Sequence, residues 1–215
     1  PRPARSPSAR RRPPFHQGCA AMIGILDYGC GNLRSLENAL AFLGLESCRV
    51  ATPEAIGEMD RLIQPGVGHF GHAMTQLRSR NLEASVKAFA ASGRPLLGIC
   101  LGMQLIFEGS DEAPEVPGLA LLPGRFEPFT DPALKVPHMG WSAVDFGDRQ
   151  GTAYFVHTYF LPAWDETVPS QMLGLAQYGR PLVAAFRSGN LAGCQFHPEK
   201  SGTWGLELLK ELVTW

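Results

Sequence analysis

The sequence predicts an α/β fold in which a mostly parallel central sheet is flanked by helices and the C-terminal half adds an antiparallel β part. In the first half, short apolar runs alternate with segments whose apolar residues recur at helical spacing, as in parallel sheets covered on both faces. From residue 119 onward short strand-like runs dominate. A final helix is marked by Leu206, Leu209 and Val213.

The expected elements of the N-terminal half alternate between strand and helix. Short apolar runs that end at turn residues predict strands at 22–26, 45–50, 61–64 and 95–99. Helical spacing predicts helices over 33–43, over 70–93 as one long helix or two short ones, and over 102–107. In the C-terminal half the strand candidates are 154–158, 172–178, 182–186 and 191–196.

Composition and charge are those of a globular domain and exclude several classes of protein. Of the 215 residues, 45% are hydrophobic and 18% are charged, which is the balance of a chain with a core. The net charge of −1 gives no electrostatic reason to bind nucleic acid. No apolar run approaches the ~20 residues that cross a bilayer, so we expect neither a nucleic-acid nor a membrane partner.

The first 21 residues differ from the rest of the chain. They contain five arginines, five prolines and no acidic residue, so 1–21 is expected to be a disordered tail and 22–215 a single domain. The five cysteines of the chain are scattered and form no C-x-x-C pair. This pattern indicates free thiols, a reducing compartment and a cytoplasmic protein.

A Gly-x-Cys-x-Gly motif lies where an apolar strand is expected to turn into a helix. In Gly98-Ile-Cys-Leu-Gly102 the glycines stand two residues on either side of Cys100, which is the nucleophile-elbow pattern with Cys in place of Ser. In so tight a turn, a side chain at either glycine would collide with neighbouring backbone. The helix N-terminus that follows favours the Cys100 thiolate, the form that attacks carbon. Alone, the motif is equally compatible with a buried structural cysteine.

A His-Pro-Glu motif near the C-terminus supplies partners for such a nucleophile. His197 and Glu199 lie two residues apart after a strand-like run, and in an extended chain both side chains point the same way. A carboxylate so placed fixes one imidazole tautomer and leaves the other nitrogen to exchange a proton with the thiol. Taken singly the pair is an ordinary strand end, but together with the elbow it predicts a Cys-His-Glu triad.

A third motif, Pro65-Gly-Val-Gly68, ends a strand that is expected to neighbour the elbow strand. Its small residues let peptide N–H groups approach a ligand closely, as an oxyanion hole requires. Without Cys100, the motif would be read as a plain strand-to-helix turn.

These motifs, in this order, resemble those of the class I, or triad, glutamine amidotransferases. Within that family, residues 22–215 are similar to the glutaminase subunits of imidazole glycerol phosphate synthase, an enzyme of histidine biosynthesis. The motifs that carry the closer resemblance are Asp27-Tyr-Gly-Cys-Gly-Asn-Leu-Arg34, Pro65-Gly-Val-Gly-His-Phe70, Gly98-Ile-Cys-Leu-Gly-Met-Gln104, Pro137-His-Met-Gly-Trp141, Phe155-Val-His-Thr-Tyr159 and His197-Pro-Glu-Lys-Ser201. The resemblance implies a flavodoxin-like domain with the antiparallel addition.

The resemblance also implies a role for each matching residue. Cys100 is the nucleophile, His197 the acid/base, and Glu199 the residue that orients His197. Backbone N–H groups form the implied oxyanion hole at Leu101, Val67 and Gly68. The residues implied to bind glutamine are Gln104, Thr158 and Tyr159. Those implied to face a partner subunit are Asp27, Tyr28, Gly29, Gly31, Asn32 and Lys200.

The implied reaction is hydrolysis of L-glutamine to glutamate and ammonia through a cysteinyl thioester. Cys100 attacks the amide carbon, His197 protonates the departing nitrogen, and water activated by His197 cleaves the thioester. Only 16 residues follow Glu199, so the site that accepts ammonia is expected in a cyclase subunit that makes imidazole glycerol phosphate. The resemblance implies no cofactor.

Other functions stay open from the sequence. The same triad supports a stand-alone cysteine hydrolase or peptidase, which would turn over fully as an isolated chain. A non-catalytic scaffold or sensor is the other alternative, and the intact triad argues against it. A dinucleotide-binding fingerprint is rejected because Arg34 stands where its third glycine would be. No metal site is expected, because no acidic or thiol ligand at matching spacing accompanies the histidines His69, His72, His138 and His157.

Overall fold

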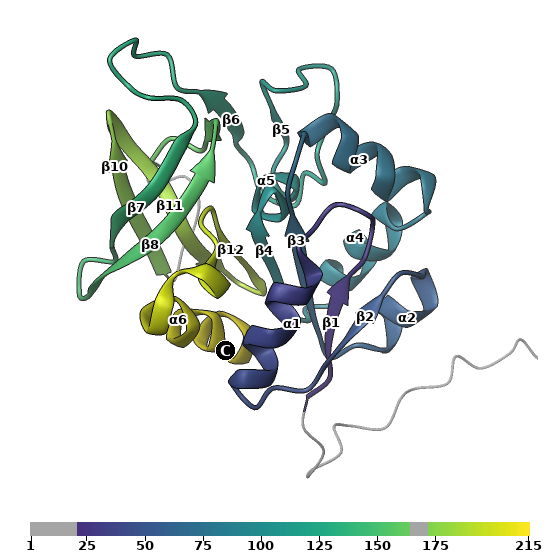
Figure 1. Cartoon of the computed structure of the whole chain (residues 1–215). Coiled ribbons are helices and arrows are strands. Elements are labelled where there is room, and N and C mark those ends of the chain that lie inside the picture. The colour runs from purple at the N-terminus through teal and green to yellow at the C-terminus, as the bar shows by residue number, and fades with distance from the viewer. Residues whose placement is uncertain (1–20, 164–171) are drawn as a thin grey trace, which may run out of the picture.

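The computed structural model describes residues 21–163 and 172–215, which form an α/β structure around a nine-stranded mixed sheet (Figure 1). The strand order is β2-β1-β3-β4-β12-β11-β10-β7-β8. Its first five strands are parallel and the remaining four are antiparallel, so the predicted fold class is confirmed. The basic segment 1–20, most of the tail expected from the sequence, lies outside the described residues.

The parallel half of the sheet contains the strands that end at the candidate site. β1 (Ile23–Leu26) lies between β2 (Ser47–Val50) and β3 (Arg61–Gly66), and β4 (Leu96–Cys100) lies between β3 and β12 (Leu191–Cys194). β1, β4 and β12 are buried at every position, because helices cover both faces of the sheet here. Their near-continuous apolar runs follow from that burial.

Four longer strands extend the sheet in antiparallel pairing: β11 (Arg180–Ser188), β10 (Met172–Tyr178), β7 (His138–Asp145) and β8 (Gln150–His157). The second half of β8 is buried at alternate positions, as expected where one face of a strand packs on the core. Three short strands form a separate small sheet: β5 (Gly109–Ser110), β6 (Arg125–Pro128) and β9 (Tyr159–Phe160).

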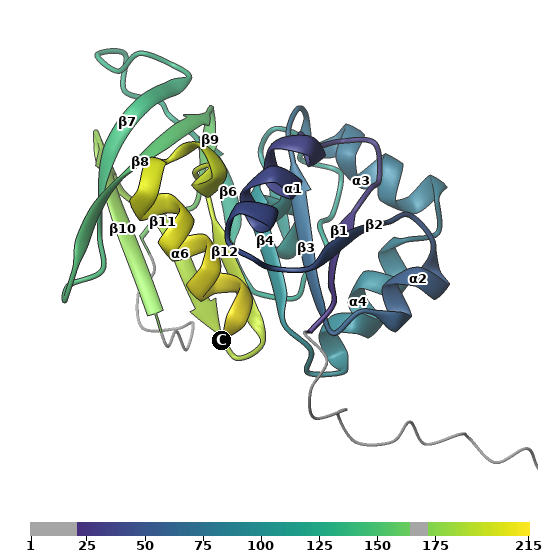
Figure 2. The same ribbon diagram turned by 60° about the horizontal axis from the view of Figure 1, so that its bottom comes forward.

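Two helices cover one face of the sheet (Figure 2). α1 (Leu33–Phe42) and α6 (Gly202–Thr214) bury apolar side chains, such as Leu40 and Leu209, in a shared core cluster on this face. The Asn32 side chain accepts a hydrogen bond from the Ser35 N–H and so caps the N-terminus of α1.

The opposite face of the sheet carries a second core cluster. Its helices are α2 (Pro53–Glu58), α3 (Phe70–Ser79), α4 (Glu83–Ala91) and α5 (Leu101–Ile106). A short 3₁₀ helix, η1 (Pro198–Lys200), connects the end of β12 to α6. Within the described part of the chain, no helix combines the length and the apolar character that a membrane crossing needs.

The expected and observed elements differ at a few positions. Residues 70–93 form two helices, because the chain turns at Asn81, whose φ is 57°. The sequence prediction missed α2, which is only six residues long, and β7, whose alternation is obscured by the exposed apolar residues Met139 and Trp141. The strand expected at 191–196 ends at Cys194.

Candidate active site

Cys100 stands at the carboxyl end of β4, where the strand turns directly into α5 at Leu101. Its φ of 54° and ψ of −116° form a backbone conformation that non-Gly residues rarely adopt. This is the strained turn of a nucleophile elbow. Cys100 is also in register with Gly66 at the end of β3, so the elbow and the Pro65-Gly-Val-Gly68 turn lie side by side, as predicted.

The two glycines of the elbow are required by close backbone contacts. A Cβ atom at Gly98 would lie 2.6 Å from the carbonyl oxygen of Gly102. A Cβ atom at Gly102 would overlap the carbonyl oxygen of Gln64 on β3. Both contacts are with backbone, which cannot move aside as a flexible side chain can. The collision expected from the sequence is therefore confirmed at both positions.

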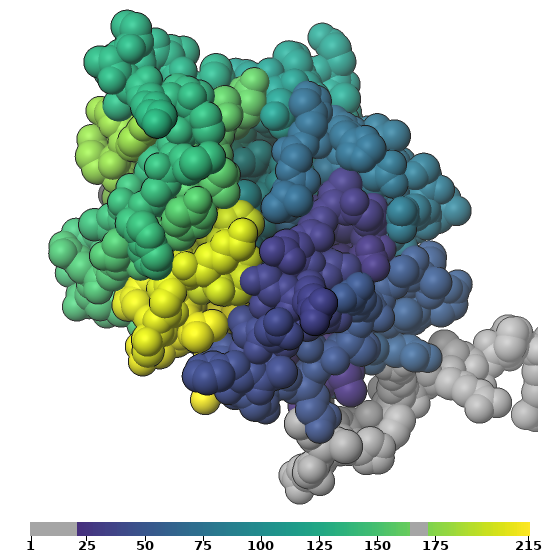
Figure 3. All heavy atoms as spheres, in the orientation of Figure 1, coloured from purple at the N-terminus to yellow at the C-terminus, as the bar shows by residue number. Residues whose placement is uncertain are grey.

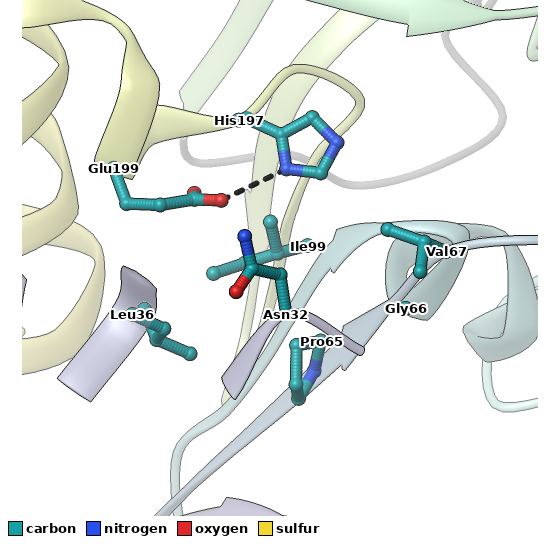
Figure 4. A pocket seen from close by; sticks show the side chains of 8 residues that line it. All are labelled: Asn32, Leu36, Pro65, Gly66, Val67, Ile99, His197 and Glu199. Atoms are coloured by element: carbon teal, nitrogen blue, oxygen red, sulfur yellow. Dashed lines mark hydrogen bonds and ion pairs between the residues drawn. The ribbon is translucent and has the colours of Figure 1, made fainter. Parts of the chain in front are cut away.

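His197 and Glu199 form a buried pair beside the elbow (Figure 4). The Nδ1 atom of His197 lies 2.9 Å from Oε1 of Glu199, and both side chains are only 4% exposed. The contact is the predicted one, but its backbone explanation was wrong. Glu199 lies in η1 rather than in an extended strand, so a tight turn brings the two side chains together.

The environment of His197 favours its protonated form. Burial lowers the pKa of His197, but hydrogen bonds to Cys100 and Glu199 and the negative charges of both groups raise it to about 10 on balance. Nδ1 is occupied by Glu199, which leaves Nε2 to serve Cys100. A protonated imidazole in this position stabilises a thiolate. The arrangement can therefore exchange a proton with a nucleophilic sulfur.

A cavity of about 380 Å³ opens beside Cys100, within the range of small-molecule sites. In the space-filling view the surface is hollowed between the strands of the C-terminal half and the segment that follows β3 (Figure 3). The residues of the predicted site that line this cavity are Val67, Gly68, Cys100, Leu101, Gln104, Thr158, Tyr159, His197 and Lys200. Segments far apart in the sequence thus meet at one edge of the sheet.

Glu199 lies behind His197, against a separate small cavity of about 10 Å³ that Asn32 also lines (Figure 4). Its Oε2 atom is buried and has no hydrogen-bond partner among the described residues. A carboxylate in this place contacts the imidazole and stays away from the larger cavity. Its geometry is that of a group that orients His197.

Two polar residues of the site were missed from the sequence. Glu112 lines the large cavity, and its Oε2 atom accepts a hydrogen bond of 2.6 Å from the backbone N–H of Phe70. Gln195 is fully buried between Gln104 and Cys100. No sequence pattern marks Glu112, which is one acid among several in a loop. Gln195 directly precedes the Phe-His-Pro-Glu run, and its adjacency to that run is the only available signal.

The family model of the class-I glutamine amidotransferases matches residues 24–214. The chain belongs to this family. Among the relatives of this amidotransferase, the imidazole glycerol phosphate synthase subunit HisH of Rhodopirellula baltica is 46% identical over 202 residues, which cover 90% of this chain and 97% of the relative. The subunit HisH of Bacillus subtilis is 42% identical over 205 residues, which cover 89% of this chain and 95% of the relative. Within class I, the amidotransferase is thus a member of the HisH family.

Solved structures share the fold of the amidotransferase at lower identity. One described as a glutamine amidotransferase has a TM-score of 0.72 and 24% identity, and the match covers 88% of this chain and 96% of that one. The structure of PurLQS from Thermotoga maritima has a TM-score of 0.68 and 16% identity, and the match covers 90% of this chain and 98% of that one. These likenesses concern the fold alone.

The loop between β1 and α1 of the amidotransferase lies outside the large cavity and departs from the sequence prediction at one residue. Asp27 and Gly31 are half-buried, and Gly29 and Asn32 are exposed. Tyr28, by contrast, is buried in the core, where its hydroxyl donates a hydrogen bond of 2.7 Å to the carbonyl oxygen of Pro65. The Tyr28 side chain therefore supports the Pro65-Gly-Val-Gly68 turn and, contrary to the expectation from the sequence, is not exposed at the surface of the described chain.

An exposed apolar surface adjoins the cavity of the amidotransferase. Met139 and Trp141 on β7 are 61% and 58% exposed. Met139 is in register with Val156 of β8, which lines the cavity, and Trp141 is in register with Tyr154. Large exposed apolar side chains next to a site mark surfaces that contact other molecules.

Proposed function

We propose that this amidotransferase is the cytoplasmic glutaminase subunit of imidazole glycerol phosphate synthase, which hydrolyses L-glutamine and passes the ammonia to a cyclase subunit. The observation that carries the proposal is the arrangement of Cys100, His197 and Glu199 at the end of a cavity of small-molecule size. The high identity to HisH subunits supports this enzyme over other glutamine amidotransferases.

The proposed reaction uses Cys100 as nucleophile. Its thiolate attacks the side-chain amide carbon of glutamine, and the carbonyl oxygen becomes an oxyanion. The Leu101 N–H at the start of α5 and an N–H of the Val67-Gly68 turn stabilise that charge. His197 then donates its proton to the departing nitrogen, so ammonia leaves and a thioester forms. Water that loses a proton to His197 attacks the thioester and releases glutamate.

The walls of the cavity suit an amino-acid substrate. Glu112 offers a carboxylate to the α-ammonium group of glutamine, and Lys200 offers an ammonium group to the α-carboxylate. The side-chain amide of Gln104 and the backbone of Thr158 and Tyr159 supply polar groups that fix the orientation of the substrate. Because recognition then depends on both charges, an amide without an α-amino acid group is a poor substrate.

The proposed heterodimer places the cyclase over the mouth of the cavity. The exposed apolar residues Met139 and Trp141 form one part of that face. The other part contains Lys200 and the residues of the β1–α1 loop that were predicted to face a partner and are not buried, namely Asp27, Gly29, Gly31 and Asn32. A partner in this place shields ammonia from protonation by bulk water.

The test is a glutaminase and synthase assay with and without the cyclase subunit and its nucleotide ligand. Wild-type chain alone is expected to hydrolyse glutamine slowly and to accelerate in the complex. Cys100→Ser is expected to abolish glutamine-dependent synthesis and to leave ammonia-dependent synthesis by the complex intact. Loss of both activities contradicts the division of labour, and full turnover by the isolated chain favours a stand-alone hydrolase.

A further inference from the structure

Gln195 connects the nucleophile to the wall of the cavity. Its Oε1 atom accepts a hydrogen bond of 3.2 Å from Nε2 of Gln104, and its own Nε2 lies 3.8 Å from Sγ of Cys100. Gln195 is fully buried and Gln104 is nearly so, so a single hydrogen bond from Gln104 to Gln195 takes the place of bonds to water. The side chain thus bridges a residue that lines the cavity and the sulfur atom.

The backbone holds Gln195 in this place. Cys194 at the end of β12 is in register with Ile99 of β4, so Gln195 and Cys100 follow side by side at the carboxyl edge of the sheet. The N–H of Gln195 donates a hydrogen bond of 2.8 Å to the carbonyl oxygen of Ala184 on β11. The side chain therefore starts from a fixed point of the sheet rather than from a mobile loop.

The chemistry of the sulfur fixes which way both amides point. A thiolate accepts hydrogen bonds and donates none, so the group of Gln195 that faces Cys100 is its NH₂ group. Oε1 of Gln195 then faces Gln104, which must present its own NH₂ group in return. Oε1 of Gln104 takes no part in the hydrogen bond to Gln195. It can therefore accept a hydrogen bond from a substrate bound in the cavity that Gln104 lines.

We infer that Gln195 is a positioning residue of the glutaminase reaction, which donates a hydrogen bond to the Cys100 thiolate and locks the Gln104 amide with its oxygen available to the substrate. The inference rests on the proposed function and adds a fourth side chain to the machinery around Cys100. It predicts that one buried amide controls two separate quantities, the reactivity of the sulfur and the affinity for glutamine.

Substitutions at Gln195 separate these two quantities. Gln195→Glu keeps an acceptor for Gln104 but removes the donor to the thiolate and adds a negative charge beside it. Gln195→Met has similar size and loses both hydrogen bonds. Among the described residues, His197, Tyr28 and Cys194 interact electrostatically with Cys100, and Glu199 lies behind His197. The charged groups Glu112 and Lys200 line the same cavity, and both variants leave all of these groups unchanged.

The first measurement is the pH dependence of Cys100 alkylation by iodoacetamide in the isolated chain. Gln195→Glu is expected to move the midpoint upward by about one pH unit or more, because a like charge disfavours the thiolate. The second is steady-state glutaminase kinetics of the complex. Gln195→Glu is expected to lower kcat about tenfold or more with KM changed less than about threefold, while Gln195→Met also raises KM about tenfold.

Gln177→Glu is the matched control, because Gln177 is exposed on β10 and the substitution is the same. If Gln195→Glu alkylates and turns over like the wild type and this control, the inference is overturned and the proposed function stands. If wild-type Cys100 neither alkylates nor supports glutamine hydrolysis in the complex, the proposed function itself fails.

Gln195 is buried, so thermal unfolding of each variant must first show a folded chain. If neither variant folds, wild-type chain labelled with ¹⁵N in its glutamine side chains provides the test. A side-chain amide protected from solvent exchange is expected to shift with the same midpoint as Cys100 alkylation. If no protected amide responds to the titration of the sulfur, the inference is overturned.

Discussion

Nδ1 of His138 lies 3.0 Å from Nε2 of His157, and both imidazole rings are buried. Nδ1 of His157 lies 2.8 Å from the carbonyl oxygen of Tyr159, which only accepts, so that nitrogen carries the proton. His138 must then donate from Nδ1 and accept at Nε2 from the Ser142 hydroxyl, 2.8 Å away. The three hydrogen bonds that link Ser142, His138, His157 and the Tyr159 carbonyl therefore form together only when both imidazoles are neutral.

Folding should therefore become less favourable in mild acid. Burial lowers the pKa of His138 to about 4 and, with an opposing hydrogen bond to Tyr159, lowers that of His157 to about 3. The unfolded chain binds these protons near pH 6.5 and the folded chain does not, so the stabilisation is complete above 6.5 and is lost as pH falls toward 4 and 3. Between pH 7 and 5.5 the expected loss is about 1 kcal/mol for each histidine, measured by urea unfolding.

His157→Gln tests this assignment, because it removes one of the two titrating groups and should flatten the loss between pH 7 and 5.5. His72→Gln, at an exposed position of α3, should leave the loss as in the wild type. His197 acts in the opposite direction, because its folded pKa is raised to about 10 and only the unfolded chain takes up this proton between pH 7 and 5.5. It should offset about 0.8 kcal/mol of the combined loss, so a net loss of about 1 kcal/mol or more remains in the wild type. A wild type equally stable at both pH values would contradict the assignment.

A methyl group at Gly102 should damage both stability and activity. The added Cβ would overlap the Gln64 carbonyl oxygen, so β3 and the elbow must move apart. We expect Gly102→Ala to cost about 1–3 kcal/mol in the free energy of unfolding. Because the proposed nucleophile Cys100 is displaced, the proposed glutaminase activity should fall about 100-fold. Chemical denaturation and steady-state assays measure the two effects.

Gly57→Ala is the control for that substitution. Gly57 lies inside α2, and a Cβ atom there would meet nothing within 4 Å. The change should stabilise the chain by roughly 0.5–1 kcal/mol, because alanine loses less backbone entropy in a helix than glycine. If both alanine variants had the same free energy of unfolding, the close contact between Gly102 and Gln64 would not determine the effect of the added methyl group.

The sequence predicts the part of the site that depends on local rules. The elbow glycines follow from steric limits on a strand-to-helix turn, and Gly98 and Gly102 meet backbone as expected. Gly66 and Cys100 are neighbours because consecutive βα units place parallel strands side by side. These inferences need only spacing, residue type and the period of the apolar pattern.

Other parts depend on tertiary contacts that have no local signature. Glu112 reaches the cavity from a loop after β5, and a lone acid in a loop resembles any solvated side chain. Tyr28 lies within a loop motif but is buried, because Pro65 on another strand offers its hydroxyl an acceptor. The His197 and Glu199 contact was predicted from an extended chain, yet η1 makes it through a turn.

Glu199→Gln should impair the chemical step far more than substrate binding. Glu199 contacts Nδ1 of His197 and does not line the large cavity. Losing its charge lowers the pKa of His197 from about 10 and loosens the ring. We expect kcat to fall about 100- to 10,000-fold with KM nearly unchanged, by steady-state assay of the complex.

The control for Glu199→Gln is Glu207→Gln, at an exposed position of α6, which should behave like the wild type. Histidine resonances followed by NMR between pH 6 and 11 report the fall in the His197 pKa directly. A raised KM with an unchanged kcat would mean that Glu199 binds substrate rather than orienting His197.

Trp141→Ala should weaken the proposed heterodimer without affecting the fold. Trp141 and Met139 are more than half exposed, so truncation opens no cavity and should change stability by less than about 0.5 kcal/mol. Buried at the centre of an interface, a tryptophan contributes about 2 kcal/mol or more, so Kd for the cyclase should rise about 30-fold or more. Titration calorimetry measures the affinity, and the rate gain on adding the cyclase should fall in parallel.

Phe42→Ala is the matched control for this surface. Phe42 is 79% exposed and is the last residue of α1. This helix runs from the carboxyl ends of the parallel strands, where Cys100 lies, back toward their amino ends (Figure 1). Removing an equally exposed aromatic ring there should leave Kd unchanged, because the ring lies away from the mouth of the cavity. If Phe42→Ala weakened binding and Trp141→Ala did not, the partner would dock on the opposite side. Ammonia would then have no protected route from Cys100 to the cyclase.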